Sequence, residues 1–196
     1  MHVKADLCMR YIPEGACMGQ TKRPSPGQLF MAVLYTATAD IASVNDALIQ
    51  AYGRAQFEHG PISFHFSDYY TQEMGTGLLK KYLLFDTYID RESIAECKLK
   101  TNRMEESYRR QGRRTVNLDP GYLTLDKLVL ATTKDFFHRI YLGTGIHAEV
   151  TLHYRRNKYR YFSWTYPDYR EPQFLAFLKK ARSTLERSHR REPNGV

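Results

Sequence analysis

The stretch VNLDPGYLTLDKLVLATTKDFFHRIYLG, residues 116–143, combines an apolar run, regularly spaced charges and a strong turn signal. Asp-Pro-Gly at 119–121 is typical of a tight turn, so a strand that begins at Val116 is predicted to end there. Thr124 can cap a helix that starts directly after it. The segment LDKLVLATTK, residues 125–134, is then predicted to be a short helix with one apolar face.

The residues before this stretch predict an alternation of strands and helices. A continuous apolar run at 29–36 is typical of a buried strand. Apolar residues at helical spacing predict a helix over 41–51 and a longer one over 94–108. Strict alternation predicts a half-buried strand at 62–67, and residues 80–89 are strand-like as well.

The residues after it predict a β-hairpin and a final helix. Residues 138–156 alternate around a Gly-Thr-Gly turn at 143–145. Pro172 opens a helix with an apolar stripe that ends at Leu185. The predicted order is β-α-β-β-α-β, then α-β-β-α. We therefore expect an α+β fold: a ferredoxin-like split βαβ core with a largely antiparallel sheet, helices on one face, and an added C-terminal β-hairpin and helix.

Length and composition predict one folded domain. The chain has 196 residues, of which 42% are hydrophobic, enough for a core of ordinary size. Residues 1–27 show no apolar period and end in TKRPSPG, so they are expected to form a flexible N-terminal extension. The single α+β domain is expected over 28–188, followed by a C-terminal tail at 189–196.

The cysteines and the absence of apolar runs predict a cytoplasmic protein. Cys8, Cys17 and Cys97 are widely spaced and form no C-x-x-C pair, which argues against a cysteine zinc site and fits reduced thiols. The sequence has no apolar run of 18 residues, so we expect no membrane-spanning segment and no membrane partner.

The net charge of +8 raises the question of nucleic acid, but much of this charge lies near the ends of the chain. Residues 1–27 carry +2 and residues 176–196 carry +4, which leaves +2 for the body. Residues 153–170 interleave arginines with aromatic residues, a pattern on which bases could stack while arginines meet phosphates. Its alternative is an edge strand followed by a tryptophan corner packed on the core.

The charges of the opening stretch are the candidate site. Asp119, Lys127, Lys134, His138 and Arg139 would suit an anionic ligand such as a phosphate if they converge. In that hypothesis Lys134 and Arg139 supply charge and Lys127 assists. His138 is the candidate acid or base, and Asp119 orients it. The alternative is a set of caps, turns and solvated faces.

Carboxylates raise the hypothesis of a divalent ion. His147 and Glu149 alternate on one strand face and could share an ion. Asp68, Asp119 and Glu149 would suit Mg²⁺ as the site of a metal-dependent hydrolase. We predict no metal site and no cofactor, with Mg²⁺ as the ion that these carboxylates would accept. The sequence contains no P-loop and no dinucleotide-binding glycine motif.

Four segments resemble a bacterial family known as domain of unknown function 4416, and the resemblance covers about residues 28–185. They are DYYTQEMGTGL (68–78), VNLDPGYLTLDKLVLATTKD (116–135), HRIYLGTGIHAEVTLHYR (138–155) and WTYPDYR (164–170). Some members of the family carry a GTP-binding name, but this sequence lacks the P-loop, and Asn157-Lys158 is not followed by the aspartate of the guanine-reading motif. The family has no established activity to carry over, so the resemblance implies where a site lies.

These arguments predict a protein that binds a small anionic, phosphorylated ligand, with a nucleotide as one candidate. The alternatives are an RNA- or protein-binding module that uses residues 153–170, and a divalent-metal hydrolase. Whether the protein is an enzyme is left open. The candidate catalytic residues are His138, Asp119 and Glu149, and the candidate ligand-binding residues are Lys127, Lys134, Arg139, Tyr122, Asp68, Tyr70 and Asp168.

Overall fold

The computed structural model describes residues 21–66 and 70–191, and side chains through Ser188. The strands are β1 (Gly27–Tyr35), β2 (Ala55–Ser63), β3 (Leu79–Ile89), β4 (Val116–Leu123), β5 (Lys127–Thr132), β6 (Ile140–Gly143), β7 (Ile146–Arg155) and β8 (Lys158–Tyr161). The helices are α1 (Ile41–Tyr52), α2 (Thr71–Met74), α3 (Ile94–Ser107) and α4 (Pro172–Arg191), with short 3-10 helices η2 (Arg91–Ser93) and η3 (Pro167–Arg170).

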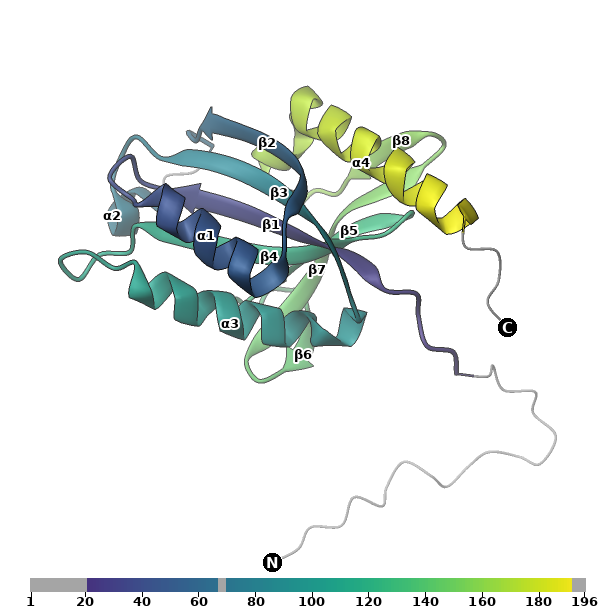
Figure 1. Ribbon diagram of the computed structural model, residues 1–196, viewed down its shortest axis with the longest axis horizontal. Helices are drawn as coiled ribbons and strands as arrows, with labels where there is room; N and C mark the ends of the chain where they lie inside the picture. Colours follow the sequence, from purple (N-terminus) through teal and green to yellow (C-terminus); the bar gives the residue numbers. More distant parts are fainter. Residues whose placement is uncertain (1–20, 67–69, 192–196) are drawn as a thin grey trace, which may run out of the picture.

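The strands form one eight-stranded sheet, so the expected α+β class is confirmed. Their order is β2-β3-β1-β4-β5-β7-β6, and β8 also pairs with β7. Each pair of neighbouring strands is antiparallel. The central strand β1 is buried along its whole length, because both faces of the sheet are covered around it (Figure 1).

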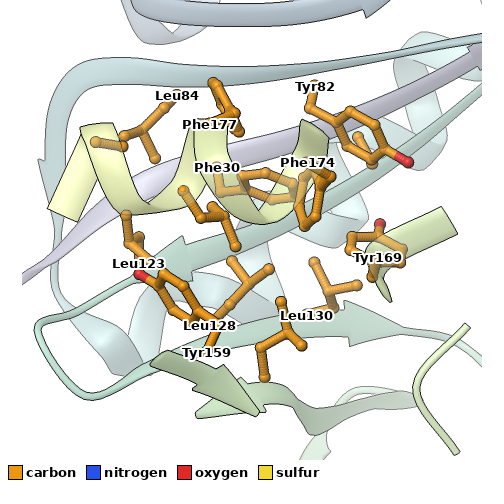
Figure 2. Packing of buried hydrophobic residues seen from close by; sticks show 14 residues of the cluster. Phe30, Tyr82, Leu84, Leu123, Leu128, Leu130, Tyr159, Tyr169, Phe174 and Phe177 are labelled. Atoms are coloured by element: carbon orange, nitrogen blue, oxygen red, sulfur yellow. The ribbon is translucent and has the colours of Figure 1, made fainter. Parts of the chain in front are cut away.

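Helices pack on both faces of the sheet, which corrects the expectation that they cover one face. Leu29 and the other odd-numbered residues of β1 pack against α1 and α3. Phe30 and Ala32 point to the opposite face, where they meet Phe174 of α4 (Figure 2). Phe174 is fully buried and lies 4.4 Å, centroid to centroid, from the ring of Tyr82. The final helix therefore closes a second core instead of adding to the first.

Helix α4 has the predicted apolar stripe, from Phe174 to Leu185, against the sheet. Its other face is charged and exposed. Among the residues that the structure describes, no helix is both long and apolar enough to cross a membrane.

The strand predicted at 62–67 lies earlier in the chain, at Ala55–Ser63. β2 pairs with β3 from Ala55 opposite Phe85 to Ser63 opposite Leu79. Most of its side chains are exposed or half-buried, because β2 is an edge strand with little packed against it. Polar residues are tolerated in such a strand, so the alternation that suggested 62–67 marked only its end.

The largest correction concerns residues 119–134. Asp119-Pro120-Gly121 forms no turn and lies within β4, while the predicted helix at 125–134 is the strand β5. The chain reverses at Thr124, whose N–H donates to the carbonyl of Lys127 at 2.9 Å. The hydroxyl of Thr124 also donates to the carboxylate of Asp126, so its side chain fixes a hairpin turn and caps no helix.

Proline and glycine fit inside β4 because its neighbour on one side is incomplete. The N–H and carbonyl of Leu118 point away from β1, so by alternation the nitrogen of Pro120 does too. On this side no strand pairs with β4 at Pro120, because the ladder to β5 begins only at Gly121. A proline there removes no ladder hydrogen bond. A Cβ on Gly121 would lie 2.3 Å from the carbonyl oxygen of Val129, so glycine permits the close approach of β5.

Candidate functional site

The sheet opens between β4 and β5, and the opening holds a cleft. Only Gly121–Leu123 of β4 pair with β5, opposite Leu128–Leu130. Beyond these residues the two strands diverge, and the side chains of Asn117, Asp119 and Thr132 line a cleft of about 420 Å³. This volume lies within the usual range for small-molecule sites, roughly 300–1,000 Å³. We call it the charged cleft.

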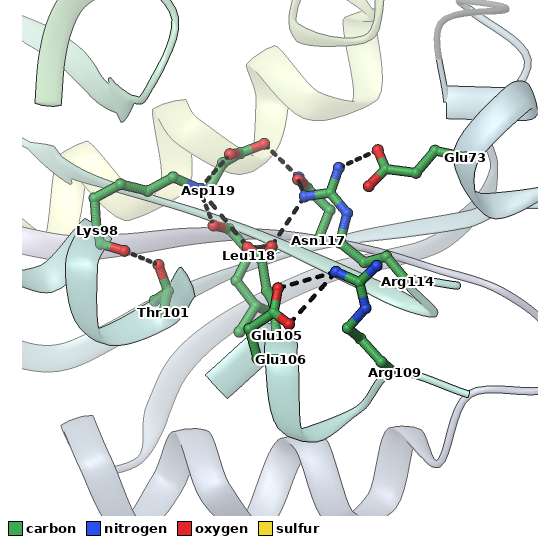
Figure 3. A network of polar contacts seen from close by, with 10 residues as sticks. All are labelled: Glu73, Lys98, Thr101, Glu105, Glu106, Arg109, Arg114, Asn117, Leu118 and Asp119. Atoms are coloured by element: carbon green, nitrogen blue, oxygen red, sulfur yellow. Dashed lines mark hydrogen bonds and ion pairs between the residues drawn. The ribbon is translucent and has the colours of Figure 1, made fainter. Parts of the chain in front are cut away.

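Helix α3 takes the place of the missing strand along the open edge of β4. The ammonium of Lys98 donates to the carbonyl of Leu118 at 2.7 Å, and the N–H of Leu118 donates to the carboxylate of Glu105 at 2.8 Å (Figure 3). Lys98 and Glu105 are both buried and lie seven residues apart on one face of the helix. Two side chains therefore provide the hydrogen bonds that β5 would otherwise supply.

Arg114 joins three side chains at the rim of the charged cleft. Its Nη1 donates to Glu105 and to Asn117, both at 2.9 Å, and its Nη2 donates to Glu73 at 2.6 Å (Figure 3). The buried Nε of Arg114 has no hydrogen-bond partner within the described residues. The guanidinium fixes α2, α3 and β4 relative to one another.

The two central carboxylates have opposite pKa shifts. Burial acts to raise the pKa of Asp119, but the charges of Lys98 and Lys80 and the hydrogen bonds from Lys98 and Asn117 outweigh it, so the pKa lies below its ordinary value. Burial raises the pKa of Glu105, even though Lys98 opposes that shift. Asp119 is thus the better-stabilised anion of the pair.

A second wall of the charged cleft is built around Lys80 of β3. Its ammonium lies 2.5 Å from Asp168 of η3, and the hydroxyl of Tyr82 donates to the same carboxylate oxygen at 2.7 Å. The ammonium also lies 4.7 Å from the ring centroid of Tyr169 and 5.1 Å from that of Phe64. Aromatic rings at this distance stabilise a buried cation, so Lys80 is held in a fixed position.

A third wall comes from the loop between β5 and β6. The Nε of Arg139 donates to Glu149 of β7 at 2.8 Å, and its Nη1 donates to the carbonyl of Lys134 at 3.0 Å. The ring nitrogen Nε2 of His138 lies 3.2 Å from the same oxygen of Glu149. The ring of His138 stacks on Trp164 with 5.1 Å between centroids. Glu149 therefore holds both residues of this loop.

The charges of the cleft wall balance. Each carboxylate forms an ion pair with a lysine or arginine of the same wall. The cationic residues that line it are Lys80, Lys98, Arg109, Arg114, Lys134 and Arg139, and the anionic ones are Glu73, Glu105, Glu106, Asp119, Glu149 and Asp168.

Most of the residues predicted from the sequence meet in this cleft. Its wall includes Tyr70, Asp119, Lys134, Arg139, Glu149 and Asp168. His138 lies behind Glu149 and outside this wall. Lys127 is elsewhere, beside Asp126 at 3.5 Å, and Tyr122 stacks under Arg91. Asp68 lies outside the described residues.

The expected orientation of His138 by Asp119 is not what the structure shows. Asp119 bonds to Lys98 and Asn117, whereas His138 bonds to Glu149. The expectation relied on a turn at 119–121 and a helix at 125–134 before the strand that starts at His138, whereas the structure has β4 and β5 there. With β5 as a strand, the two residues lie on opposite sides of the opening.

Sequence reasoning missed several residues of the wall, among them Lys80, Lys98, Glu105 and Arg114. Lys80 could have been found from the strand pattern: it lies two residues from Tyr82 and shares its face of β3, whereas the apolar Leu83 points to the other face. For Lys98 and Glu105 the signal was a polar pair that borders the apolar stripe of α3 at helical spacing. Nothing in the sequence indicated Arg114, because its position depends on how the loop before β4 returns to the sheet.

Of the residues proposed for a divalent ion, Asp68 lies outside the described part of the chain, and His147 and Glu149 contact different partners. Within the part of the chain that the structure describes, no three histidines, cysteines or carboxylates lie close enough to hold a metal ion. His147 lies 3.4 Å from Asp135, and Glu149 faces Arg139 instead.

The basic and aromatic segment at 153–170 forms an edge strand and a corner packed on the sheet. Trp164 donates its indole N–H to the carbonyl of Val150 at 3.2 Å, and Thr165 donates its hydroxyl to the carbonyl of Thr151 at 2.7 Å. These side chains cover the edge of β7 between β6 and β8. Arg155 and the other arginines of the β7–β8 hairpin remain exposed.

Fold and site together define an α+β protein with a charge-balanced cleft in the opening of a mostly antiparallel sheet. The chain belongs to the family described as domain of unknown function 4416, whose model matches residues 25–185. This range includes the whole wall of the charged cleft. Searches of the curated proteins and of the solved structures find no significant match.

Proposed function

We propose that this protein binds a small phosphorylated ligand, such as a nucleotide or a phosphosugar, in the charged cleft, and that it does so in the cytoplasm. The observation that carries the proposal is the state of Arg139. This buried guanidinium lines the cleft. Its Nε donates to Glu149, and one hydrogen of its Nη1 donates to the carbonyl of Lys134. Its remaining N–H donors make no hydrogen bond within the described residues.

A phosphate is the chemistry that such donors suit. A guanidinium presents five N–H groups in a planar fork that matches the spacing of phosphate oxygens. None of these Arg139 donors is among the fully buried atoms that lack a partner, so they are accessible to a ligand in the cleft. A hydrogen bond between a guanidinium and a phosphate is charge-assisted and is stronger than a hydrogen bond between neutral groups. Because the carboxylates of the wall are already paired with cations, an incoming anion meets little uncompensated negative charge.

The size of the charged cleft supports a ligand with a polar body as well as a phosphate. Tyr70, Tyr166 and Tyr169 offer ring surface, while Asn102 and Thr133 offer polar groups. Such a mixture of a few polar groups and aromatic walls is typical of a small-molecule site. His138 and Glu149 are the pair that would move a proton if chemistry follows binding.

A thermal-shift screen tests the proposal. The panel contains inorganic phosphate, nucleoside phosphates and sugar phosphates, each with and without Mg²⁺. A ligand at a hundred times its dissociation constant should stabilise the wild-type protein by about 2.7 kcal/mol. Arg139→Lys keeps the charge but loses the fork, so it should reduce this shift; the matched Arg155→Lys, on the exposed hairpin, should not. Absence of any shift across the panel contradicts the proposal.

A second candidate function is nucleic-acid binding through the β7–β8 hairpin. The observation that favours it is the exposure of Arg155, Arg156 and Arg160 beside the half-exposed ring of Tyr161. Binding by such a surface weakens steeply as salt concentration rises. A charge-reversed variant with Arg155→Glu and Arg156→Glu should abolish RNA binding and leave the ligand-induced thermal shift unchanged.

We also propose that the first four strands and the helices α1 and α3 form a ferredoxin-like unit. The antiparallel order β2-β3-β1-β4 supports this, because β3 lies between the two strands that α1 connects. In this view β5 to β8 and α4 are an extension, and the charged cleft lies where the extension joins the unit.

A further inference from the structure

The sheet has three edge strands in the described part of the chain, and only β6 lacks charge. β2 contains Glu58 and Pro61, and β8 contains Lys158 and Arg160. Charged residues and proline on an edge strand discourage pairing with another chain. β6 has neither, because its sequence is Ile-Tyr-Leu-Gly. Its free edge is open to a further strand.

The side chains around this edge are apolar and exposed. Phe136 is 58% exposed, Phe137 87%, Ile140 71%, Tyr141 62% and Leu142 42%. We call these five residues the β6 patch. Successive residues of a strand point to opposite faces of the sheet, so Tyr141 flanks this edge on one face and Ile140 and Leu142 flank it on the other. Exposed apolar side chains gathered at an open sheet edge are typical of an interaction site.

We propose that the β6 patch joins two copies of this chain, with β6 paired antiparallel to β6 of the second copy. A strand that pairs antiparallel with its own copy is related to it by a two-fold axis. The same patch therefore serves both sides, and association closes at a dimer. The sheets of the two copies become continuous through this contact.

The area of the patch is a large part of what such a dimer needs. If an aromatic side chain buries about 150–250 Å², the exposed fractions of Phe136, Phe137 and Tyr141 amount to roughly 300–500 Å². Ile140 and Leu142 add to this area. A standard interface buries about 800 Å² on each partner, so the β6 patch supplies a large part of it.

A protein strand fits the β6 patch better than a lipid surface does. The free edge of β6 carries backbone N–H and carbonyl groups that hydrocarbon cannot satisfy, whereas a second strand satisfies them. The net charge of +8 makes two copies repel each other, but β6 itself contributes no charge to the contact. Salt that screens the repulsion should therefore strengthen the dimer.

The β6 patch adjoins the charged cleft. The loop between β5 and β6 places Phe136 and Phe137 on the surface, and it places Lys134 and Arg139 on the cleft wall. The ring of Phe136 lies 5.4 Å from the guanidinium carbon of Arg139. Dimer contact would thus hold in place the loop that supplies the guanidinium. The dimer itself does not depend on ligand binding.

Sedimentation velocity on the full chain at micromolar concentrations tests the dimer. Ile140→Lys places a charge on the edge strand, and Ile49→Lys is a matched control on α1, where the side chain is 47% exposed. We expect the wild type and Ile49→Lys to sediment as dimers and Ile140→Lys as a monomer with an unchanged circular dichroism spectrum. If Ile140→Lys does not fold, Phe137→Ser should weaken the dimer in its place.

Two results would overturn the proposal. One is an unexpected mass in sedimentation: either the wild type is a monomer, or the folded Ile140→Lys and Phe137→Ser variants are as dimeric as the wild type. The other is a monomeric wild type that co-sediments with vesicles of phosphatidylcholine and phosphatidylserine and loses this binding in Phe137→Ser, which would assign the β6 patch to a membrane surface.

Discussion

Lys98 is the residue on which the open edge of β4 depends. Its ammonium is buried, with 5% of the side chain exposed, and it contacts the carbonyl of Leu118, Asp119 at 3.0 Å and Glu105 at 3.7 Å. A buried cation is costly unless its partners replace the water that it loses. Here two carboxylates and one carbonyl do so, and each of them in turn relies on the lysine.

Replacement of Lys98 by methionine keeps the length of the side chain and removes the charge. Because the half-buried Asp119 then loses its lysine partner, the buried Glu105 keeps only Arg114 and the Leu118 carbonyl loses its donor, we expect the free energy of unfolding to fall by about 3–5 kcal/mol. Lys100→Met, on the exposed side of the same helix, should change it by less than about 0.5 kcal/mol. Urea denaturation of both variants measures the difference, and equal effects would contradict this account of Lys98.

Asp119 gives a pH dependence with a defined sign. Its pKa is lowered in the folded protein from an ordinary value of 3.8, so its ionised form stabilises the fold above that pH. This stabilisation is lost as the pH falls from about 3.8 through the lower pKa of the folded state. The folded state binds the proton less readily than the unfolded state does, which fixes the direction.

The prediction for Asp119→Asn follows. The variant should be less stable than the wild type near neutral pH, and the gap between their free energies of unfolding should shrink as the pH falls below about 4. Denaturation midpoints measured between neutral and acidic pH check this, with Asp46→Asn on the exposed face of α1 as the control. A gap that grows in acid would show that Asp119 is not stabilised as an anion.

At the scale of elements, the β4–β5 hairpin shows what the sequence could and could not predict. The apolar runs and helical stripes predicted β1, β3, α1, α3, α4 and the β6–β7 hairpin, because local patterns determine which face of these elements is buried. Asp-Pro-Gly at 119–121 led to a wrong prediction of a turn, because the turn preference of these residues reflects only their immediate neighbours in the chain. Its actual role depends on β5, which diverges at this place and leaves Pro120 paired with β1 alone.

A substitution at Gly121 tests how closely β5 approaches β4. A Cβ at this position would lie 2.3 Å from the carbonyl oxygen of Val129 and 2.8 Å from a methyl group of Leu130. Gly121→Ala should therefore destabilise the protein by about 1–3 kcal/mol or more, as overpacking does. Amide hydrogen exchange should also show weaker protection of Leu128 and Leu130. An alanine variant as stable as the wild type would mean that β5 does not approach β4 so closely.

At the scale of the whole molecule, the site is a product of long-range assembly. The sequence predicted that Asp119, Lys134, Arg139 and Glu149 converge, and the structure brings them to one cleft. It could not predict the ion pairs that hold the cleft wall together, because several of them join elements far apart in the chain. Lys80 and Asp168, for example, are 88 residues apart and meet only once α4 has closed the second core.

The second core explains how the wall of the charged cleft is kept rigid. Tyr82 and Tyr169 pack around Phe174, and the hydroxyl of Tyr82 holds Asp168. Helix α4 thus supports the cleft through aromatic packing, although it contributes no residue to the wall. Preorganised walls of this kind lower the cost of binding a ligand.

The most direct test of the central claim is amide chemical-shift mapping by NMR, with the phosphate compound that gives the largest thermal shift as the titrant. If the charged cleft is the binding site, the largest changes should fall on Asn117, Asp119, Thr132–Lys134 and Arg139, and they should be lost in Arg139→Lys. Changes confined to the β7–β8 hairpin or to α4, or no changes at all, would contradict it.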